Sequence, residues 1–157
     1  MTTRRILAAA LVLAGCGGSV TNGPAPTAVL TLTASPNPVV GGLCGSDCGN
    51  LEGERQALTD LTIRETAGVG VHLTGGSQVL RDNATGAVMN MSGFIPSIFI
   101  RDAGTARIPA SGQLVFPTGI HYPAVHAGAT ATFTFTIEAI DDNGHAVSVT
   151  LAVPTTG

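Results

Sequence analysis

Apolar and polar residues alternate most regularly near the C-terminus, in "ATATFTFTIEAIDDNGHAVSVTLAVP" (residues 129–154). From 130 to 139 every second residue is apolar and the others are threonine or glutamate, the pattern of a strand with one buried face. Asn143–Gly144 then supplies a pair favoured in tight hairpin turns. The return strand repeats the alternation at Val147, Val149, Leu151 and Val153. We therefore predict an antiparallel hairpin here.

Shorter runs of the same kind occupy most of the preceding chain. The prolines of "PNPVVGG" (36–42) predict a break after the first run, because proline cannot donate to a ladder. No stretch shows a sustained period of 3.6 residues. Seven or eight short strands separated by turns predict an all-β fold, an antiparallel β-sandwich. The short runs lie at 28–35, 57–66, 69–76, 77–82, 86–93, 97–102 ("SIFIRD") and 112–117, before the final hairpin.

The first residues, "MTTRRILAAALVLAGCGGS", have the layout of a secretory signal peptide. Two arginines precede an uncharged apolar stretch (6–13), and two small residues follow it. The apolar stretch is about half of the ~20 residues that a membrane-spanning helix needs. We therefore expect residues 1–15 to be a cleaved leader.

The ending "LAGC" resembles the lipobox of bacterial lipoproteins. The resemblance implies that cleavage occurs before Cys16 and that this cysteine carries the lipid anchor. Gly17, where aspartate would signal retention in the inner membrane, implies the outer membrane in a cell that has one. Residues 16–26, rich in glycine, serine, asparagine and proline, then form a lipidated flexible tether, and 27–157 the domain.

Two passages resemble bacterial immunoglobulin-like domains. "LTASPNPVVGG" (32–42) is similar to their first strand, and "FTFTIEAIDDNGHAVSVTLAV" (133–153) to their last hairpin. The resemblance implies an immunoglobulin-like sandwich used for display, adhesion or spacing, without catalytic residues. The chain departs from the family's pattern in lacking tryptophan and a cysteine pair that could bridge two sheets. The core then depends on valine, leucine, isoleucine and five phenylalanines.

Charge narrows the possible partners. The basic residues are seven arginines, two of them in the expected leader, against ten acidic residues. The remaining chain therefore has five arginines (7 − 2) against those ten acids. This acidic balance argues against nucleic acid or an anionic membrane surface as the partner.

Cys44 and Cys48 lie in "LCGSDCGN" (43–50). With Cys16 assigned to lipid, they are the two remaining thiols of a chain expected in an oxidising compartment, where a local disulfide is the default. The alternative is a Cys₂His₂ zinc site with His121 and His126; the spacing of these residues is its only support. The C-x-x-x-C spacing in a β-rich chain does not suit a thioredoxin-like redox site.

The stretch "PTGIHYPAVHAG" (117–128) gathers polar and aromatic residues in an expected loop. Functional residues concentrate on loops between rigid strands, so His121, Tyr122 and His126 form the candidate binding loop. The alternative is a connection between strands in which Tyr122 packs.

Other chemistry finds weaker support. Met89 and Met91 share a strand face that would suit Cu(I), but partial burial in the core is the preferred explanation of them. Asp141, Asp142 and Asn143 resemble a fragment of a calcium loop, but hairpin turn chemistry explains them. No G-x-S-x-G elbow is present. We predict no catalytic residues, no metal site and no cofactor.

These observations predict a lipid-anchored, extracytoplasmic module of the bacterial cell envelope, with a structural, adhesive or protein-interaction role and no catalysis. Its expected partners are the membrane, through the lipid, and an envelope protein or surface polymer. The alternative is a periplasmic protein that binds a metal or small ligand through histidine and methionine side chains.

Overall fold

The computed structural model describes residues 23–43, 54–123 and 130–156, which form nine strands and one helix. The all-β prediction is confirmed; the described strands number nine, where seven or eight were predicted. The elements are β1 (Leu30–Ser35), β2 (Val39–Leu43), β3 (Glu54–Glu65), β4 (Val71–Asp82), β5 (Val88–Phe94), α1 (Pro96–Ala103), β6 (Arg107–Ile108), β7 (Gln113–Pro123), β8 (Ala131–Asp141) and β9 (Ala146–Thr156).

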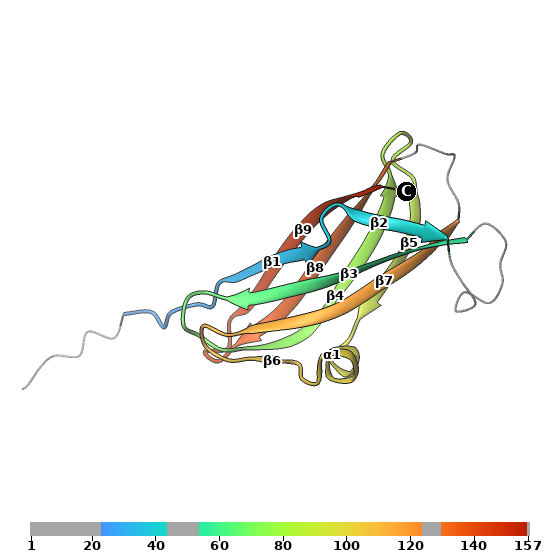
Figure 1. Cartoon of the computed structure of the whole chain (residues 1–157). Helices are drawn as coiled ribbons and strands as arrows, with labels where there is room; N and C mark the ends of the chain where they lie inside the picture. Colours follow the sequence, from blue (N-terminus) through green and yellow to red (C-terminus); the bar gives the residue numbers. More distant parts are fainter. Residues whose placement is uncertain (1–22, 44–53, 124–129, 157) are drawn as a thin grey trace, which may run out of the picture.

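The strands lie in two layers, and β2 takes part in both (Figure 1). In one layer β3 lies between β7 and the first two strands, since β1 pairs with the C-terminal half of β3 and β2 with its N-terminal half. In the other layer the order is β9, β8, β4, β5, and β6 also pairs with β4. Because β2 pairs with β9 as well, the layers form one continuous sheet.

The prediction that all strands pair antiparallel is wrong for β2 and β9, which run parallel. β1 ends at Ser35, and Pro36 and Pro38 separate it from β2, as the sequence predicted. β2 continues after the break and pairs with the N-terminal half of β3 on one side. On its other side β2 pairs with β9, which runs in the same direction, so the sheet is mixed.

The C-terminal hairpin is confirmed. β8 and β9 pair antiparallel from Ala131 opposite Thr155 to Ile140 opposite Ala146. The odd-numbered residues of β8 are buried, and Phe133 and Phe135 stack with their ring centroids 4.9 Å apart. The turn has Gly144 at a φ of 86°, a conformation that glycine adopts without strain.

The core lies between the two layers. The odd-numbered residues of β3 from 57 to 65 are buried, and they face the buried residues of β4 and β8. Alternation on strands from both layers therefore builds one interior. Its largest fully buried apolar side chains are Phe99, Phe116, Phe133, Phe135, Leu61, Ile63, Leu80, Ile108 and Ile137.

"SIFIRD" (97–102), which we predicted to be a strand, lies in helix α1. Pro96 occupies the first turn, where proline's missing N–H costs nothing, and Gly104 caps the other end with a φ of 79°. Phe99 is the buried residue of the helix. The short apolar run Ile98–Ile100 fits either element, and these end signals decide for a helix.

The two ends of the elongated domain differ (Figure 1). The near pole is the end where residues 23–29 enter, and it carries the β3–β4 and β8–β9 connections. The far pole carries the β4–β5 turn and the ends of β2, β7 and β9. The segments that contain Cys16, Cys44 and Cys48 lie outside the described residues.

At the near pole, the buried carboxylate of Glu65 holds three segments together. Its oxygens accept N–H groups from Ala67 at 2.6 Å, Gly68 at 2.9 Å, Ser111 at 2.8 Å and Val29 at 3.4 Å. Burial opposes ionisation, but the four backbone donors outweigh it, so the pKa of Glu65 is lowered. The carboxylate thereby fixes the β3–β4 connection, the start of β7 and the entry of the chain.

Asp141 fastens the entering chain to the β8–β9 turn. Its carboxylate accepts the N–H groups of Ala28 at 3.1 Å, Asn143 at 2.9 Å and His145 at 2.8 Å, and its Oδ2 lies 3.1 Å from the His145 ring Nδ1. The Asn143 side chain also donates to the Pro26 carbonyl at 2.7 Å. These contacts confirm hairpin turn chemistry for Asp141 and Asn143.

Acid should weaken the domain through Asp141. Burial opposes its ionisation, but the His145, Ala28 and Asn143 donors lower the pKa from 3.8 to about 2. A lowered pKa gives stability that is present above the unfolded-state value and lost as the pH falls towards 2. Chemical unfolding at pH 7, 4 and 2.5 should show a shallower acid loss for Asp141→Asn than for the wild type, from a lower starting value. Parallel losses would refute this role, and Asp60→Asn, at an exposed carboxylate, is the matched control.

Candidate functional site

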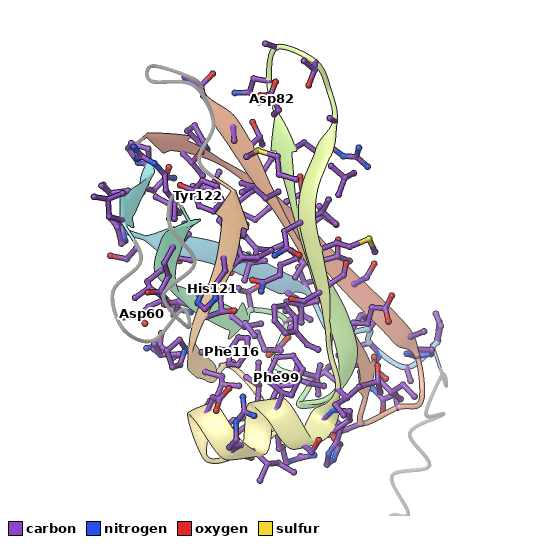
Figure 2. All side chains as sticks on the ribbon, turned by 90° about the vertical axis from the view of Figure 1, so that its right-hand side faces the viewer. Asp60, Asp82, Phe99, Phe116, His121 and Tyr122 are labelled. Carbon is purple, nitrogen blue, oxygen red and sulfur yellow. The ribbon has the colours of Figure 1, made fainter. Side chains whose placement is uncertain are left out.

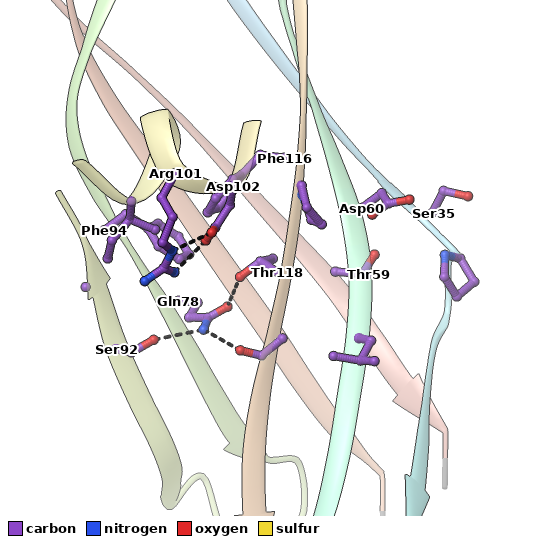
Figure 3. Close-up of a pocket in the computed structure, with 16 residues that line it drawn as sticks. Ser35, Thr59, Asp60, Gln78, Ser92, Phe94, Arg101, Asp102, Phe116 and Thr118 are labelled. Carbon is purple, nitrogen blue, oxygen red and sulfur yellow. Dashed lines mark hydrogen bonds and ion pairs between the residues drawn. The ribbon is translucent and has the colours of Figure 1, made fainter. Parts of the chain in front are cut away.

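An open cleft of about 700 Å³ lies where β5, β7, α1 and the β1–β2 break meet (Figure 3). Its volume is within the range of small-molecule sites, about 300–1,000 Å³. Its lining lies on both sides of β7, an edge strand of its layer. The lining residues are Ser35, Pro36, Leu58, Thr59, Asp60, Gln78, Ser92, Gly93, Phe94, Ile98, Arg101, Asp102, Phe116, Pro117, Thr118 and Gly119.

An irregularity in β4 turns Gln78 into this cleft. At the start of β4 the odd-numbered Val71 and Leu73 are buried, whereas after a register shift between Leu73 and Gly75 the even-numbered Gln78 and Leu80 are buried. A bulge of this kind exchanges the two faces of a strand. A polar side chain thereby enters the interior.

The Gln78 amide connects the two layers across the cleft (Figure 3). Its Nε2 donates to the Ser92 hydroxyl at 2.8 Å and to the Gly119 carbonyl at 2.9 Å, while the Thr118 hydroxyl donates to its Oε1 at 3.1 Å. Gln78 is 3% exposed, so these partners meet the requirement that buried polar groups be hydrogen-bonded. β4, β5 and β7 are thus joined by one side chain.

Three phenylalanines close the cleft against α1. Phe99 lies 4.8 Å from Phe116 and 5.9 Å from Phe94 between ring centroids, and Phe94 meets Phe116 edge to face at 5.1 Å. Tilted and edge-on arrangements of this kind are favoured between aromatic rings. The helix is therefore held on the sheets by an aromatic cluster (Figure 2).

Charged groups lie at the rim. Arg101 and Asp102 form a two-point ion pair at 2.5 and 2.6 Å, and the Arg101 guanidinium lowers the pKa of Asp102 by hydrogen bonding. Asp60 also lines the cleft, on the outer face of β3. The Thr59 hydroxyl is buried and has no hydrogen-bond partner among the described residues. The cleft lining contains no histidine, cysteine or tyrosine.

The edge of β7 that faces away from β3 is partly occupied. The Glu65 N–H donates to the Gly112 carbonyl, next to the start of β7. It follows that the even-numbered residues of β7 direct their backbone N–H and C=O groups to β3, and the odd-numbered residues of β7 direct theirs away from it. On that free edge, Gln78 and Asn90 side chains donate to the carbonyls of 119 and 121, and Pro117 has no N–H. These features discourage pairing with another strand.

The candidate binding loop is placed differently from the prediction. β7 continues to Pro123, so His121 and Tyr122 belong to a strand and not to a loop, and His126 lies outside the described residues. Tyr122 is buried, which raises the pKa of its hydroxyl, whereas His121 is half-buried on the opposite face (Figure 2). In this structure Tyr122 therefore packs in the core.

The methionines of β5 do not act as a pair. Met89 packs against the core, whereas Met91 is 66% exposed. Within the described ranges, no group of three or more histidine, cysteine, aspartate or glutamate side chains could hold a metal ion. The same ranges contain no helix that is long and apolar enough to cross a membrane.

The cleft was missed from the sequence because six separate elements build it. Gln78 had one local signal, since Gly75 and Gly76 within a strand pattern often mark a bulge. A side chain on Gly76 would lie 2.4 Å from the Thr136 carbonyl, which shows how closely β8 approaches.

No protein-family model matches the chain, and no curated protein matches it. Among solved structures, a Bordetella pertussis protein designated ApaA superposes with a TM-score of 0.52 at 10% identity, covering 83% of this chain and 96% of that one. A structural-genomics target designated SoR45 has a TM-score of 0.50 at 9% identity and covers 83% and 86%. At such identities the likeness concerns the fold alone.

Proposed function

We propose that this chain is a lipid-anchored, non-catalytic immunoglobulin-like module of the bacterial cell envelope, with a structural, adhesive or protein-interaction role. The observation that carries the proposal is the difference between the poles. Residues 26–28 are fastened to the β8–β9 turn at one pole, and the far pole points away from this attachment. A membrane tether joined there would present the far pole to partners.

The strand arrangement supports the immunoglobulin-like assignment. β1 pairs with β3, whereas β2 pairs with both β3 and β9, so the start of the domain joins the two layers of the sandwich. β1, β3 and β7 then face β9, β8, β4 and β5. Stacked Phe133 and Phe135 occupy the interior in place of tryptophan and an inter-sheet disulfide.

The anchor is proposed from the leader and from "LAGC", with Cys16 as the lipid acceptor and residues 16–26 as the tether. Cys44 and Cys48, which lie in the sequence between β2 and β3, are proposed to form a local disulfide. The acidic composition supports a protein or polymer as partner and not a nucleic acid. In cells with two membranes, the outer membrane is the proposed location.

Replacing Cys16 with serine should abolish lipid attachment, because serine has no thiol to accept a diacylglyceryl group. Cells grown with an alkyne analogue of palmitate should label the wild-type chain and leave Cys16→Ser unlabelled and released from the membrane fraction. Cys44→Ser serves as the control and should label normally. Equal labelling of wild type and Cys16→Ser would contradict the anchor.

A further inference from the structure

We propose that the cleft binds a primary ammonium group carried on an unbranched apolar stem, with Asp60 as its counter-ion. The inference rests on the proposed binding role and is independent of the lipid anchor. It specifies the chemistry of the partner: a free alkylamine or a lysine side chain would both present the required group.

The charges of the cleft favour a cation. Its charged side chains are Asp60, Asp102 and Arg101. Arg101 and Asp102 satisfy each other through two hydrogen bonds, while no contact within the described residues pairs Asp60. One negative charge, that of Asp60, is therefore left for a ligand.

The surface around Asp60 favours an apolar stem behind that cation. Pro36, Leu58 and Pro117 line the cleft beside it, and Leu58 is 55% exposed although it is a large apolar residue. Opposite Leu58, Gly119 lacks a side chain; a Cβ there would lie 2.3 Å from the Leu58 Cδ2. Long aliphatic ammonium groups bury their methylenes on such surfaces and keep the charge at the edge.

The partly occupied edge of β7 disfavours a peptide strand as the ligand. A peptide strand would need free backbone groups on β7, but the carbonyls of Gly119 and His121 are occupied by Gln78 and Asn90. Pro117 removes a donor between Val115 and Gly119. Recognition therefore falls to the side-chain surface, which suits a stem and a single charge.

Calorimetric titration of the whole chain in a non-ionic detergent tests the proposal. Pentylammonium should bind, and 1-pentanol, which has the same stem without the charge, should bind at least tenfold more weakly. Asp60→Asn should weaken pentylammonium binding about tenfold, the worth of a charged hydrogen bond. Glu138→Gln removes the same charge from a separate hollow of about 370 Å³ and should leave binding unchanged.

Equal affinity for the alcohol, no effect of Asp60→Asn, or an equal effect of Glu138→Gln would overturn the proposal, as would no binding of pentylammonium. An acetylated Ala-Lys-Ala amide and its norleucine counterpart then identify the source. Binding of the lysine peptide supports a protein partner, and binding of pentylammonium alone supports a small amine. If the wild-type chain does not bind pentylammonium but is still labelled with palmitate at Cys16, the ammonium site is refuted and the lipid anchor is not.

Discussion

Replacing Glu65 with leucine should lower the free energy of unfolding at neutral pH by about 3 kcal/mol or more. The carboxylate accepts four backbone N–H groups from three segments, two of them within 2.8 Å. Leucine matches its bulk but accepts none of these bonds, so the donors are left buried without partners. Urea unfolding followed by circular dichroism measures the loss.

Two variants sharpen this result. Glu65→Gln retains one carbonyl oxygen and should lose about half as much stability as Glu65→Leu. Glu138→Leu makes the same replacement at an exposed position of β8 and should change stability by no more than about 0.5 kcal/mol. A Glu65→Leu chain as stable as the Glu138→Leu chain would show that the carboxylate does not hold the near pole together.

Replacing Phe99 with alanine should cost about 3–5 kcal/mol, the usual range for a large aromatic side chain in a core. Phe99 is fully buried, and its ring contacts Phe94 and Phe116. Its loss leaves a cavity below α1 and removes the contact that holds the helix over the cleft. Thermal and urea unfolding measure the change.

Ile100→Ala is the matched control, because Ile100 follows Phe99 on the same helix and is 56% exposed. It should alter stability by less than about 0.5 kcal/mol. Hydrogen exchange should show faster exchange of the α1 amides in Phe99→Ala than in Ile100→Ala. Similar stability and similar exchange in the two variants would contradict the role of the aromatic cluster.

The sequence predicted those parts of the fold that depend on residues close together along the chain. The β8–β9 hairpin was predictable because each strand buries one face and the turn needs Asn143–Gly144. Helix α1 was not, because eight residues give only two turns and Ile98–Ile100 reads as a strand. Pro96 and Gly104 at its ends were the available signals.

Long-range contacts account for what the sequence could not predict. The parallel pairing of β2 with β9 joins residues more than a hundred positions apart, and no local pattern specifies it. Glu65 is one of the odd-numbered, buried residues of β3, yet its partner Ser111 is 46 positions away. Gln78 enters the cleft only because β4 contains a bulge. Asp60 becomes a candidate binding residue only because Pro36 and Pro117, which are distant in the sequence, line the same cleft.

Photo-crosslinking in intact cells tests most directly whether the far pole of an anchored module meets the partner. Ala84, in the β4–β5 turn at the far pole, and Ala67, in the β3–β4 connection at the near pole, are both exposed alanines. Each is replaced in turn by p-benzoylphenylalanine, irradiated, and its products identified by mass spectrometry. We predict that Ala84→p-benzoylphenylalanine captures one recurring envelope protein or polymer and that the Ala67 variant captures far less of it. Equal capture from both positions, or no envelope product from Ala84, would contradict the account.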